Sequence, residues 1–509
     1  MTIFRGFLYG TFFYYMMNLT KDLYTSSLAL LTDFYQLTMA YAYWKNGLAE
    51  RESVFHLFFR SNPFDGGYAV SCGLEYVMDY LQQFSFSQED VDYLSTIKSK
   101  TGNRLFEQGF LDYLAGMKFS CDLDAVAEGT VVFPHEPLIR IAGPVIQCQL
   151  LETPLLNMVN FQTLIATKSS RINLSAGGEP VLEFGLRRAQ GIDGGLSASR
   201  AAFIGGCAST SNVLAGKLFG IPVSGTHAHS WIMTFDSEID AFYAYAHALP
   251  DNCIFLVDTY DSLNGVKNAI EVGKMLREKG KHMAGIRIDS GDLAYISQEA
   301  RKLLDEAGFH DVDIVASNNL DEHLVKSLKN QDARISMWGI GTKLATAYDQ
   351  PALGGVYKMS AIRNEHGEWE YKIKLSEQTE KINNPGIHQV RRYYNDTGKM
   401  VADMIYDINL GITDRKTIFH PADNTKRKLL DEQALRKHDL LVPVFRNGVP
   451  VYVRPGIKEI QSKAKEELGQ MHAGIKRFEN PHTYPVGLEQ KLYDKKMELI
   501  FKLRQFEIH

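Results

Sequence analysis

Two histidines separated by one residue mark the stretch of this chain best suited to chemistry. His227 and His229 follow Gly225 in the run Ser224-Gly-Thr-His-Ala-His-Ser-Trp231, directly after the apolar run Leu218-Phe-Gly-Ile-Pro-Val223, which predicts a short buried strand. In extended geometry, residues i and i+2 point to the same side of the chain. A histidine on a loop just past a strand end is a candidate nucleophile, base or metal ligand. The alternative is that both are hydrogen-bonded loop histidines.

The same plan recurs from Pro180 to Met359, where short apolar runs end in polar residues or glycine and helical stretches follow. The runs are Val181–Arg188, Ile221–Thr226, Ile254–Asp261, Ala284–Asp292, Val312–Asn319 and Ile335–Thr342. The later runs are spaced by about 25–30 residues, the length of one strand–helix unit. Successive units predict a parallel sheet, with a barrel as the expected closure. The polar clusters would then converge, because the carboxyl ends of barrel strands form one site.

Glycine and arginine at these predicted strand ends indicate an anionic small molecule, and several phosphates would suit them. Gly339-Ile-Gly-Thr342 offers backbone N–H groups that can approach a phosphate closely. Arg287-Ile-Asp-Ser-Gly-Asp292 combines a guanidinium fork for phosphate with carboxylates that can accept from ribose hydroxyls or hold Mg²⁺ through water. Arg187-Arg188 adds positive charge beside the same mouth. An ion-pair network at a barrel rim is the alternative for the Arg287 cluster.

A zinc site is a competing interpretation of the two histidines. Asp258, Asp261 and Asp289 could complete such a site with His227 and His229. The surroundings, however, are glycine and hydroxyl residues suited to phosphate, and no cysteine lies nearby. We therefore favour phosphate binding and assign no metal ligand.

The amino-acid composition argues against several other classes of protein. With 509 residues, 45% hydrophobic and 23% charged, the chain resembles a soluble globular protein of two or three domains. The net charge of -5 gives no general basic footprint for nucleic acid. Five scattered cysteines without a Cys-x-x-Cys pair argue against a disulfide framework and for a reducing compartment, so we expect a cytoplasmic protein.

Residues 1–24 are set aside as an N-terminal extension. Met1–Leu19 is aromatic-rich but too short and interrupted to span a membrane, and a natural start at Met16 or Met17 would make the extension non-native. No other apolar run approaches transmembrane length, and we expect no membrane partner.

The rest of the chain divides into three parts. An N-terminal α+β domain is predicted for residues 25–149, an α/β barrel for 150–359, and a C-terminal segment for 360–509. Two hairpin-like pairs open the last part: Tyr357–Arg363 with Trp369–Leu375, and Gln389–Tyr394 with Met400–Tyr406. We expect this region to rejoin the N-terminal β-domain in part.

A series of motifs, in the right order, resembles nicotinate phosphoribosyltransferase. They are Asp33-Phe-Tyr-Gln-Leu-Thr-Met39, Phe59-Arg-Ser-Asn-Pro-Phe64, Glu183-Phe-Gly-Leu-Arg-Arg-Ala-Gln-Gly191, Ser211-Asn-Val-Leu-Ala-Gly-Lys217, Gly225-Thr-His-Ala-His-Ser230, Ile288-Asp-Ser-Gly-Asp-Leu293, Gly339-Ile-Gly-Thr342 and Pro351-Ala-Leu-Gly-Gly-Val-Tyr-Lys358. The resemblance extends from about Leu30 to Tyr406. It implies an irregular (β/α) barrel of the type II phosphoribosyltransferase kind, with a smaller α+β domain formed by the N- and C-terminal segments.

The resemblance also implies an activity. The family joins nicotinate to phosphoribosyl pyrophosphate, giving nicotinate mononucleotide and pyrophosphate in NAD salvage, and couples the reaction to ATP hydrolysis through a transient phosphohistidine. Mg²⁺ would arrive with phosphoribosyl pyrophosphate, and ATP would be a co-substrate. A homodimer with shared active sites is expected.

Individual roles follow from the same resemblance. The motif Gly-Thr-x-Ala-His-Ser puts the phosphohistidine at His229, and the aromatics that sandwich the pyridine ring, one from each subunit, fall on Tyr35 and Phe184. Arg287 and Asp289 join His229 as expected catalytic residues. The other expected substrate ligands are Arg187, Thr226, Ser290 and Gly291, with Ser317, Asn318, Gly339, Gly341 and Thr342 at the 5′-phosphate.

One departure bears on the substrate. The related nicotinamide enzyme has an aspartate that receives the amide, whereas here the comparable run, Thr210-Ser-Asn-Val213, has no carboxylate to repel nicotinate. The acid is therefore favoured over the amide. The alternatives are a nicotinamide or quinolinate phosphoribosyltransferase, and a non-catalytic sugar-phosphate-binding protein on the same fold. His229 argues against the last, because binding alone would not need it.

Overall fold

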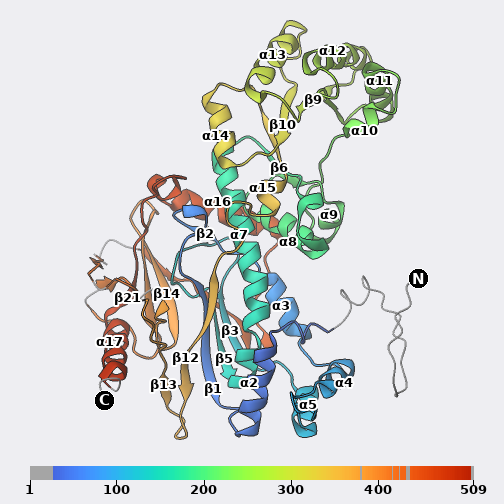
Figure 1. Ribbon diagram of the computed structural model, residues 1–509. Coiled ribbons are helices and arrows are strands. Elements are labelled where there is room, and N and C mark those ends of the chain that lie inside the picture. The colour runs from blue at the N-terminus through green and yellow to red at the C-terminus, as the bar shows by residue number, and fades with distance from the viewer. Residues whose placement is uncertain (1–26, 379–380, 415–416, 424, 431–435, 506–509) are drawn as a thin grey trace, which may run out of the picture.

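The computed structural model describes residues 27–378, 381–414, 417–423, 425–430 and 436–505, so the extension expected at residues 1–24 lies outside the described residues. Figure 1 shows a lower block built from the two ends of the chain and an upper block built around a parallel sheet from its middle. Helix α7 (Glu152–Ala176) runs between the blocks. Within the described part of the chain, no helix is both long and apolar enough to cross a membrane.

An antiparallel sheet forms the centre of the lower block. Its order is β13-β12-β1-β5-β3-β19-β20, with β1 (Glu52–Phe59), β3 (Asp122–Val126), β5 (Ile139–Pro144), β12 (Gly355–Arg363), β13 (Trp369–Tyr371), β19 (Leu441–Arg446) and β20 (Val449–Pro450). The helices of this region are α2 (Phe34–Lys45), α3 (Leu74–Gln83), α4 (Gln88–Thr96), α5 (Gln108–Gly116) and α6 (Val145–Leu150), with the turn η1 (Pro63–Asp65). Strand β1 is buried from Ser53 onward because β12 and β5 flank it on either side.

Of the two predicted C-terminal hairpins, only the first pairs with the N-terminal sheet. The first was predicted correctly: β12 and β13 pair with each other, and β12 pairs with β1. The second does not rejoin the N-terminal sheet. Its strands belong to a further sheet of order β17-β16-β21-β15-β14-β18, with β14 (His388–Tyr394), β15 (Met400–Asp407), β16 (Thr417–Phe419), β17 (Arg427–Leu429), β18 (Arg436–Asp439) and β21 (Val486–Glu489). The sheets remain joined, because Leu440 is the single residue between β18 and β19.

Two charged helices near the C-terminus pack against the sheets. They are α16 (Ile457–Gln470), followed by η5 (Ala473–Lys476), and α17 (Gln490–Gln505). Glu467 of α16 lies 2.9 Å from the fully buried guanidinium of Arg392, which also pairs with Asp403. An unpaired charge would be costly at this depth, so the pair fixes α16 against the sheet.

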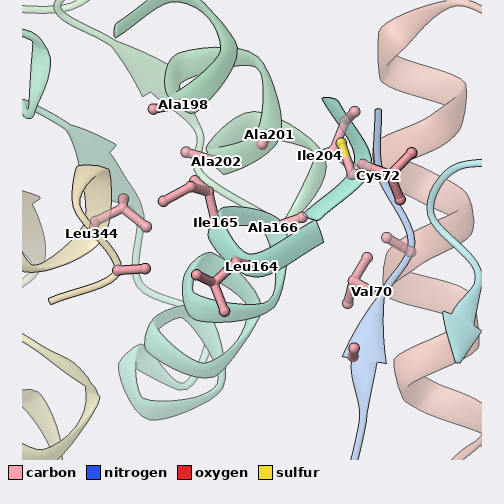
Figure 2. Packing of buried hydrophobic residues seen from close by; sticks show 14 of the residues in the cluster. Val70, Cys72, Leu164, Ile165, Ala166, Ala198, Ala201, Ala202, Ile204 and Leu344 are labelled. Atoms are coloured by element: carbon pink, nitrogen blue, oxygen red, sulfur yellow. The ribbon is translucent and has the colours of Figure 1, made fainter. Parts of the chain in front are cut away.

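Helix α7 is the core element that joins the blocks. It continues without a break to Ala176, and Gly177 ends it in the left-handed region. Figure 2 shows α7 packed against α8 (Gly191–Ile204) on one side and against the β2 (Ala69–Val70) segment on the other. The side chains labelled in this cluster are Leu164, Ile165 and Ala166 with Ala198, Ala201, Ala202, Ile204, Val70, Cys72 and Leu344. The small α8 residues permit a close approach of the two helices.

Strand β2 pairs with β4 (Val131–Val132).

The upper block contains the predicted parallel sheet. Its order is β7-β6-β11-β10-β9-β8, with β6 (Val181–Glu183), β7 (Ser209–Thr210), β8 (Cys253–Leu256), β9 (Met283–Ile288), β10 (Asp313–Asn318) and β11 (Met337–Ile340). The connecting helices are η2 (Leu186–Arg188), α9 (Val213–Phe219), α10 (His229–Ile232), α11 (Glu238–Ala248), α12 (Ser262–Glu278), α13 (Leu293–Glu306), α14 (Glu322–Asn330) and α15 (Thr342–Ala345). Five of the six predicted runs therefore contain a strand.

The strand predicted at Leu218–Val223 and at Ile221–Thr226 is wrong. Leu218 and Phe219 complete α9, Gly220 then takes a left-handed conformation with φ +71°, and Val223 alone forms an isolated bridge, to Thr210. Pro222 also lacks the N–H that a ladder needs. The strand that follows β6 in the chain and pairs with it is β7, whose two residues are too few for a periodicity signal.

The barrel is irregular. Beyond β7 the sheet continues only as the Val223 bridge, and in the described residues no strand pairing joins this edge to β8. A side chain spans the gap: the backbone N–H of Leu256 in β8 donates to Nε2 of His227 over 3.2 Å. The two edges of the sheet thus approach each other without completing the ladder.

Candidate active site

The carboxyl ends of the parallel strands bring most of the expected substrate ligands to one mouth. In strand order, these are Phe184 after β6, Thr226 after the Val223 bridge, Arg287, Asp289, Ser290 and Gly291 at β9, Ser317 and Asn318 at β10, and Gly339, Gly341 and Thr342 at β11. The parallel register aligns Ser317 with Gly339 and Gly339 with Leu182, so neighbouring strands end at one level. Sequence reasoning therefore grouped these residues correctly.

Arg287 is the centre of this mouth. Its Nε donates to Ser317 Oγ over 2.7 Å, Nη1 to Thr226 Oγ1 over 3.0 Å, and Nη2 to Asp289 Oδ1 over 3.1 Å. The Ser317 hydroxyl donates in turn to Asp289, and the guanidinium lies 5.6 Å from the Phe184 ring centroid. Partners from three segments hold the guanidinium in one orientation, as a preorganised anion site requires.

Asp258 is a site residue that sequence reasoning considered only as a zinc ligand. Its Oδ2 accepts the Asp289 backbone N–H over 3.0 Å and the Ser290 hydroxyl over 2.5 Å. Its Oδ1 is buried and has no hydrogen-bond partner among the described residues. The signal was available in its position, because Asp258 follows β8 as Asp289 follows β9.

The two histidines have different surroundings. His229 opens α10, is half-buried, and its Nδ1 lies 3.1 Å from the Thr259 hydroxyl. His227 is buried, with its ring centroid 4.9 Å from that of Tyr245, and burial lowers its pKa to about 4. The chain passes from extended backbone at Ala228 into α10 at His229, and the two rings contact different partners, the Leu256 N–H and the Thr259 hydroxyl.

The zinc interpretation does not fit this arrangement. Nε2 of His227 already accepts the Leu256 N–H, so the ring cannot offer that nitrogen to a metal. Across the described residues, no group of three or more His, Cys, Asp or Glu side chains is arranged to hold a metal ion.

Backbone geometry at the mouth explains several small residues. A Cβ on Gly339 would lie 2.8 Å from the Phe184 ring, so glycine makes room for that aromatic platform. Gly291 has φ +79°, and Asn318 has φ +129°. Residues other than glycine rarely adopt a positive φ. Such strain concentrates at functional sites because the surrounding structure must hold it in place.

Comparisons with known proteins bear on this site. The nicotinate phosphoribosyltransferase N-terminal domain model matches residues 30–160, the family model residues 181–394, and the C-terminal domain model residues 387–496. Nicotinate phosphoribosyltransferase of Bacillus subtilis (strain 168) is 44% identical over 485 residues, covering 94% of this chain and 96% of that one. This chain belongs to the nicotinate phosphoribosyltransferase family.

Two further relatives agree. Nicotinate phosphoribosyltransferase of Homo sapiens is 33% identical over 91% of this chain and 95% of its own. The crystal structure of human nicotinic acid phosphoribosyltransferase superposes with a TM-score of 0.81 at 31% identity, covering 92% of this chain and 99% of that chain. A nicotinate-nucleotide pyrophosphorylase from Pyrococcus furiosus, with a TM-score of 0.66 at 22% identity, covers 90% of this chain and 99% of its own and shows the fold alone.

One residue that the family resemblance assigned to substrate, Tyr35, does not join the mouth within one chain. Tyr35 lies on α2 beside Glu152, where burial and that carboxylate raise its pKa to about 12. Lys168, which contacts the loop after β11, lies 16 residues further along α7 than Glu152, or about 24 Å along the helix. Tyr35 is therefore remote from the mouth. Arg187 is exposed on η2 and has no side-chain partner among the described residues.

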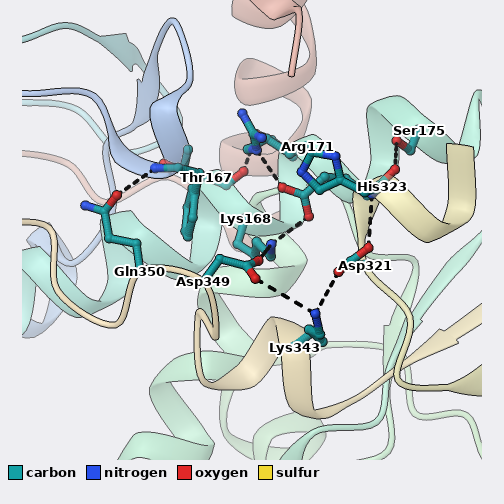
Figure 3. A network of polar contacts seen from close by, with 12 residues as sticks. Thr167, Lys168, Arg171, Ser175, Asp321, His323, Lys343, Asp349 and Gln350 are labelled. Carbon is teal, nitrogen blue, oxygen red and sulfur yellow. Dashed lines mark hydrogen bonds and ion pairs between the residues drawn. The ribbon is translucent and has the colours of Figure 1, made fainter. Parts of the chain in front are cut away.

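A partly buried ionic network supports the loop after β11 (Figure 3). Lys343, next to Thr342, donates to Asp321 over 2.9 Å and lies 3.8 Å from Asp349. Asp349 also pairs with the fully buried Lys168, whose ammonium lies 5.0 Å from the Phe64 ring centroid. The network thus connects the candidate phosphate loop to the turn after β1 in the N-terminal region. Sequence reasoning missed it because its members are far apart in the chain.

The run Thr210–Val213 is neutral, but a carboxylate lies beneath it. Glu183 is buried and accepts the Thr210 hydroxyl over 2.6 Å and the Ser199 hydroxyl over 2.9 Å. Asn212 caps α9 through the Ala215 N–H. Both side chains are therefore occupied within the fold, and Ser211 is the member of the run whose side chain has no partner among the described residues.

Proposed function

We propose that this protein transfers the phosphoribosyl group of phosphoribosyl pyrophosphate to nicotinate, giving nicotinate mononucleotide and pyrophosphate for NAD salvage, and that ATP hydrolysis is coupled to the transfer through phosphorylation of His229. The observation that carries the proposal is the Arg287 cluster, which combines a fixed guanidinium, two carboxylates and glycine-rich strand ends at one mouth beside His229.

The sugar phosphate is held by groups with matching chemistry. Backbone N–H groups and the hydroxyl of Gly339–Thr342 receive the 5′-phosphate, and Ser317 and Asn318 border it on β10. Arg287 meets the pyrophosphate, and Arg187 adds charge from the rim. Glycosyl transfer develops positive charge on the ribose, and the Asp289 carboxylate, held by Arg287 and Ser317, stabilises that charge electrostatically.

The carboxylates also fit a Mg²⁺ ion that enters with phosphoribosyl pyrophosphate. Mg²⁺ in such sites keeps several waters and needs only one or two carboxylates besides the substrate phosphates. Asp258, whose buried Oδ1 has no hydrogen-bond partner among the described residues, and Asp289 would hold it. The ion would supply neutralisation of the leaving pyrophosphate.

The pyridine ring stacks on Phe184, and its second face is covered by Tyr35 of another copy of the chain. Five apolar side chains are exposed at and before the start of α2, namely Leu28, Leu31, Phe34, Tyr35 and Met39. A homodimer that formed over this segment would bury them. The run Thr210–Val213, which contains Ser211, carries no negative charge that would repel the carboxylate of nicotinate.

His229 is arranged to accept a phosphoryl group. When its Nδ1 carries the proton and donates to the Thr259 hydroxyl, Nε2 presents a lone pair. Attack on the γ-phosphorus of ATP forms the N–P bond as the bond to ADP breaks, and water later cleaves the phosphohistidine. The added negative charge draws in cationic groups such as Arg187 and tightens the mouth.

The cytoplasm is the proposed location. All five cysteines are buried and unpaired, which agrees with a reducing compartment.

Pyridine specificity tests the proposal. Purified protein receives phosphoribosyl pyrophosphate, Mg²⁺ and nicotinate, nicotinamide or quinolinate, with and without ATP, beside His229→Ala. Mononucleotide from nicotinate alone, stimulated by ATP in the native protein and not in the variant, is the expected result. Turnover of nicotinamide or quinolinate instead would overturn the substrate, and no turnover would leave a sugar-phosphate-binding protein.

A further inference from the structure

His227 fills a structural gap at the point where the barrel fails to close. Leu256 is 1% exposed, so its backbone N–H needs a partner within the protein. In a closed barrel, a carbonyl of the neighbouring strand would accept it. Here the neighbouring edge is only the Val223 bridge, and Nε2 of His227 accepts the N–H instead.

The imidazole is held so that it can do this. Its ring packs 4.9 Å from the Tyr245 ring and 6.1 Å from the Phe242 ring, centroid to centroid, and Phe255 borders it at 6.5 Å. These aromatics fix the direction of Nε2. They also remove the ring from water, and burial lowers its pKa to about 4, so Nε2 keeps its lone pair at neutral pH.

The position of this contact in the chain connects it to the chemistry. One residue before His227, Thr226 accepts from Arg287 over 3.0 Å. Two residues after it, His229 meets Thr259, which lies three residues beyond Leu256. The contact therefore sets the register between the histidine loop and β8, on which both neighbouring contacts depend.

We propose that His227 is a positioning residue that clasps the phosphohistidine loop to β8, so that His229 stays beside Thr259 and Thr226 stays on Arg287. The inference rests on the proposed coupling of ATP through His229. It gives His227, which the family motif leaves as an unspecified position, a role in that coupling.

Three variants distinguish the loss of the hydrogen bond from Leu256 to His227 from the loss of packing around the His227 ring. His227→Gln places an amide oxygen near the position of Nε2 and retains the acceptor. His227→Phe keeps an aromatic ring in the cage and removes the acceptor. Phe242→Leu loosens the cage and leaves the acceptor in place. Melting temperatures establish that each variant folds.

The first readout is the rate of hydrogen exchange at the Leu256 amide. The second is the amount of acid-labile phosphate that the protein takes from ATP. The KM for nicotinate, measured with and without ATP, accompanies the second readout. We expect His227→Phe to lose Leu256 protection and at least tenfold of its phosphohistidine yield. It should also lose the ATP-dependent decrease in KM. His227→Gln should remain within threefold of the native protein in both readouts, and Phe242→Leu should lower the melting temperature without uncoupling ATP.

Two outcomes would overturn the clasp: unchanged Leu256 exchange in His227→Phe, or equal phosphorylation in His227→Phe and the native protein. A native protein that never phosphorylates His229 would overturn the proposed coupling instead. The exchange measurement would then still decide whether His227 holds the Leu256 amide, so the two failures are distinguishable.

Discussion

Asp258 at the end of β8 accepts the backbone amide of Asp289 at the end of β9, over 3.0 Å. The same oxygen accepts the Ser290 hydroxyl, and the other carboxylate oxygen is buried without a hydrogen-bond partner among the described residues. One carboxylate thus fixes the backbone of the next strand end while leaving an oxygen free for a cation. This relationship connects the framework of the sheet to the chemistry of the mouth.

Replacing Asp258 tests that connection. Asp258→Ala leaves the Asp289 N–H and the Ser290 hydroxyl without their acceptor, so we expect kcat/KM for phosphoribosyl pyrophosphate to fall about a hundredfold, equivalent to about 2.7 kcal/mol. Initial rates over a Mg²⁺ titration measure the effect, and half-saturation should move to higher Mg²⁺. The matched control is Asp251→Ala, which removes an exposed carboxylate paired with Lys281. Native rates in Asp258→Ala would exclude the role.

Gly339→Ala tests the aromatic platform. The new Cβ would lie 2.8 Å from the Phe184 ring, which must then move. We expect the KM for nicotinate to rise at least about tenfold with a smaller change in the KM for ATP, since a displaced platform weakens stacking on the pyridine. Gly469→Ala, in α16 with open space around the position, is the control and should keep native kinetics. An unchanged nicotinate KM in Gly339→Ala would remove Phe184 from the pyridine site.

Shared active sites predict complementation between chains. Tyr35→Ala and Phe184→Ala should each lose most of their activity, because each removes one face of the proposed pyridine site. Mixing the two variants under conditions that exchange subunits should restore part of the activity, since some mixed dimers contain one intact site. Activity is recorded while the subunits exchange, and native mass spectrometry measures the fraction of mixed dimers. Full activity of a monomer, or no recovery in verified mixed dimers, would contradict the shared site.

Buried histidines predict a loss of stability in acid. Burial lowers the pKa of His227 and His388 to about 4 and that of His135 to about 3, and it lowers the pKa of His56, which stacks on His388. The unfolded chain takes up protons at these groups below a pH of about 6.5, and the folded chain does not until a pH of about 4. The free energy of unfolding therefore falls as the pH drops through this window.

Urea denaturation at a series of pH values measures this dependence. Each unit of pKa lowering corresponds to about 1.4 kcal/mol per group, so a loss of more than about 2 kcal/mol between pH 6.5 and 4.5 is expected. His388→Gln should flatten the slope, whereas His310→Gln, at the surface, should not. A free energy that stays constant across the window would contradict the assigned burial.

Local patterns in the sequence predicted most of the parallel strands and the edge of the sheet at which their polar ends meet. The strand-end clusters at Arg287, Ser317 and Gly339 were located correctly because parallel strands with regular spacing have only one end at which polar residues can converge. The strand at Ile221–Thr226 failed because Gly220 and Pro222 act through backbone conformation that hydrophobicity does not report.

Long-range contacts were out of reach of local patterns. Lys168 and Asp349 pair across 181 residues, and Glu183 lies beneath a run that is neutral on its own. The third sheet was missed for a similar reason, because β21 joins β15 from more than eighty residues away. Such partners are chosen by tertiary packing, which a hairpin pattern in the sequence cannot specify.

Counting ADP and nicotinate mononucleotide together tests whether ATP hydrolysis is coupled to the transfer through His229. Native protein and His229→Ala are each given nicotinate, phosphoribosyl pyrophosphate, Mg²⁺ and ATP, and ADP and nicotinate mononucleotide are counted in the same sample. We predict equal amounts of ADP and mononucleotide from the native protein, and mononucleotide without ADP at a reduced rate from the variant. Mononucleotide from the native protein without matching ADP, or ADP formation that survives in His229→Ala, would contradict the coupling.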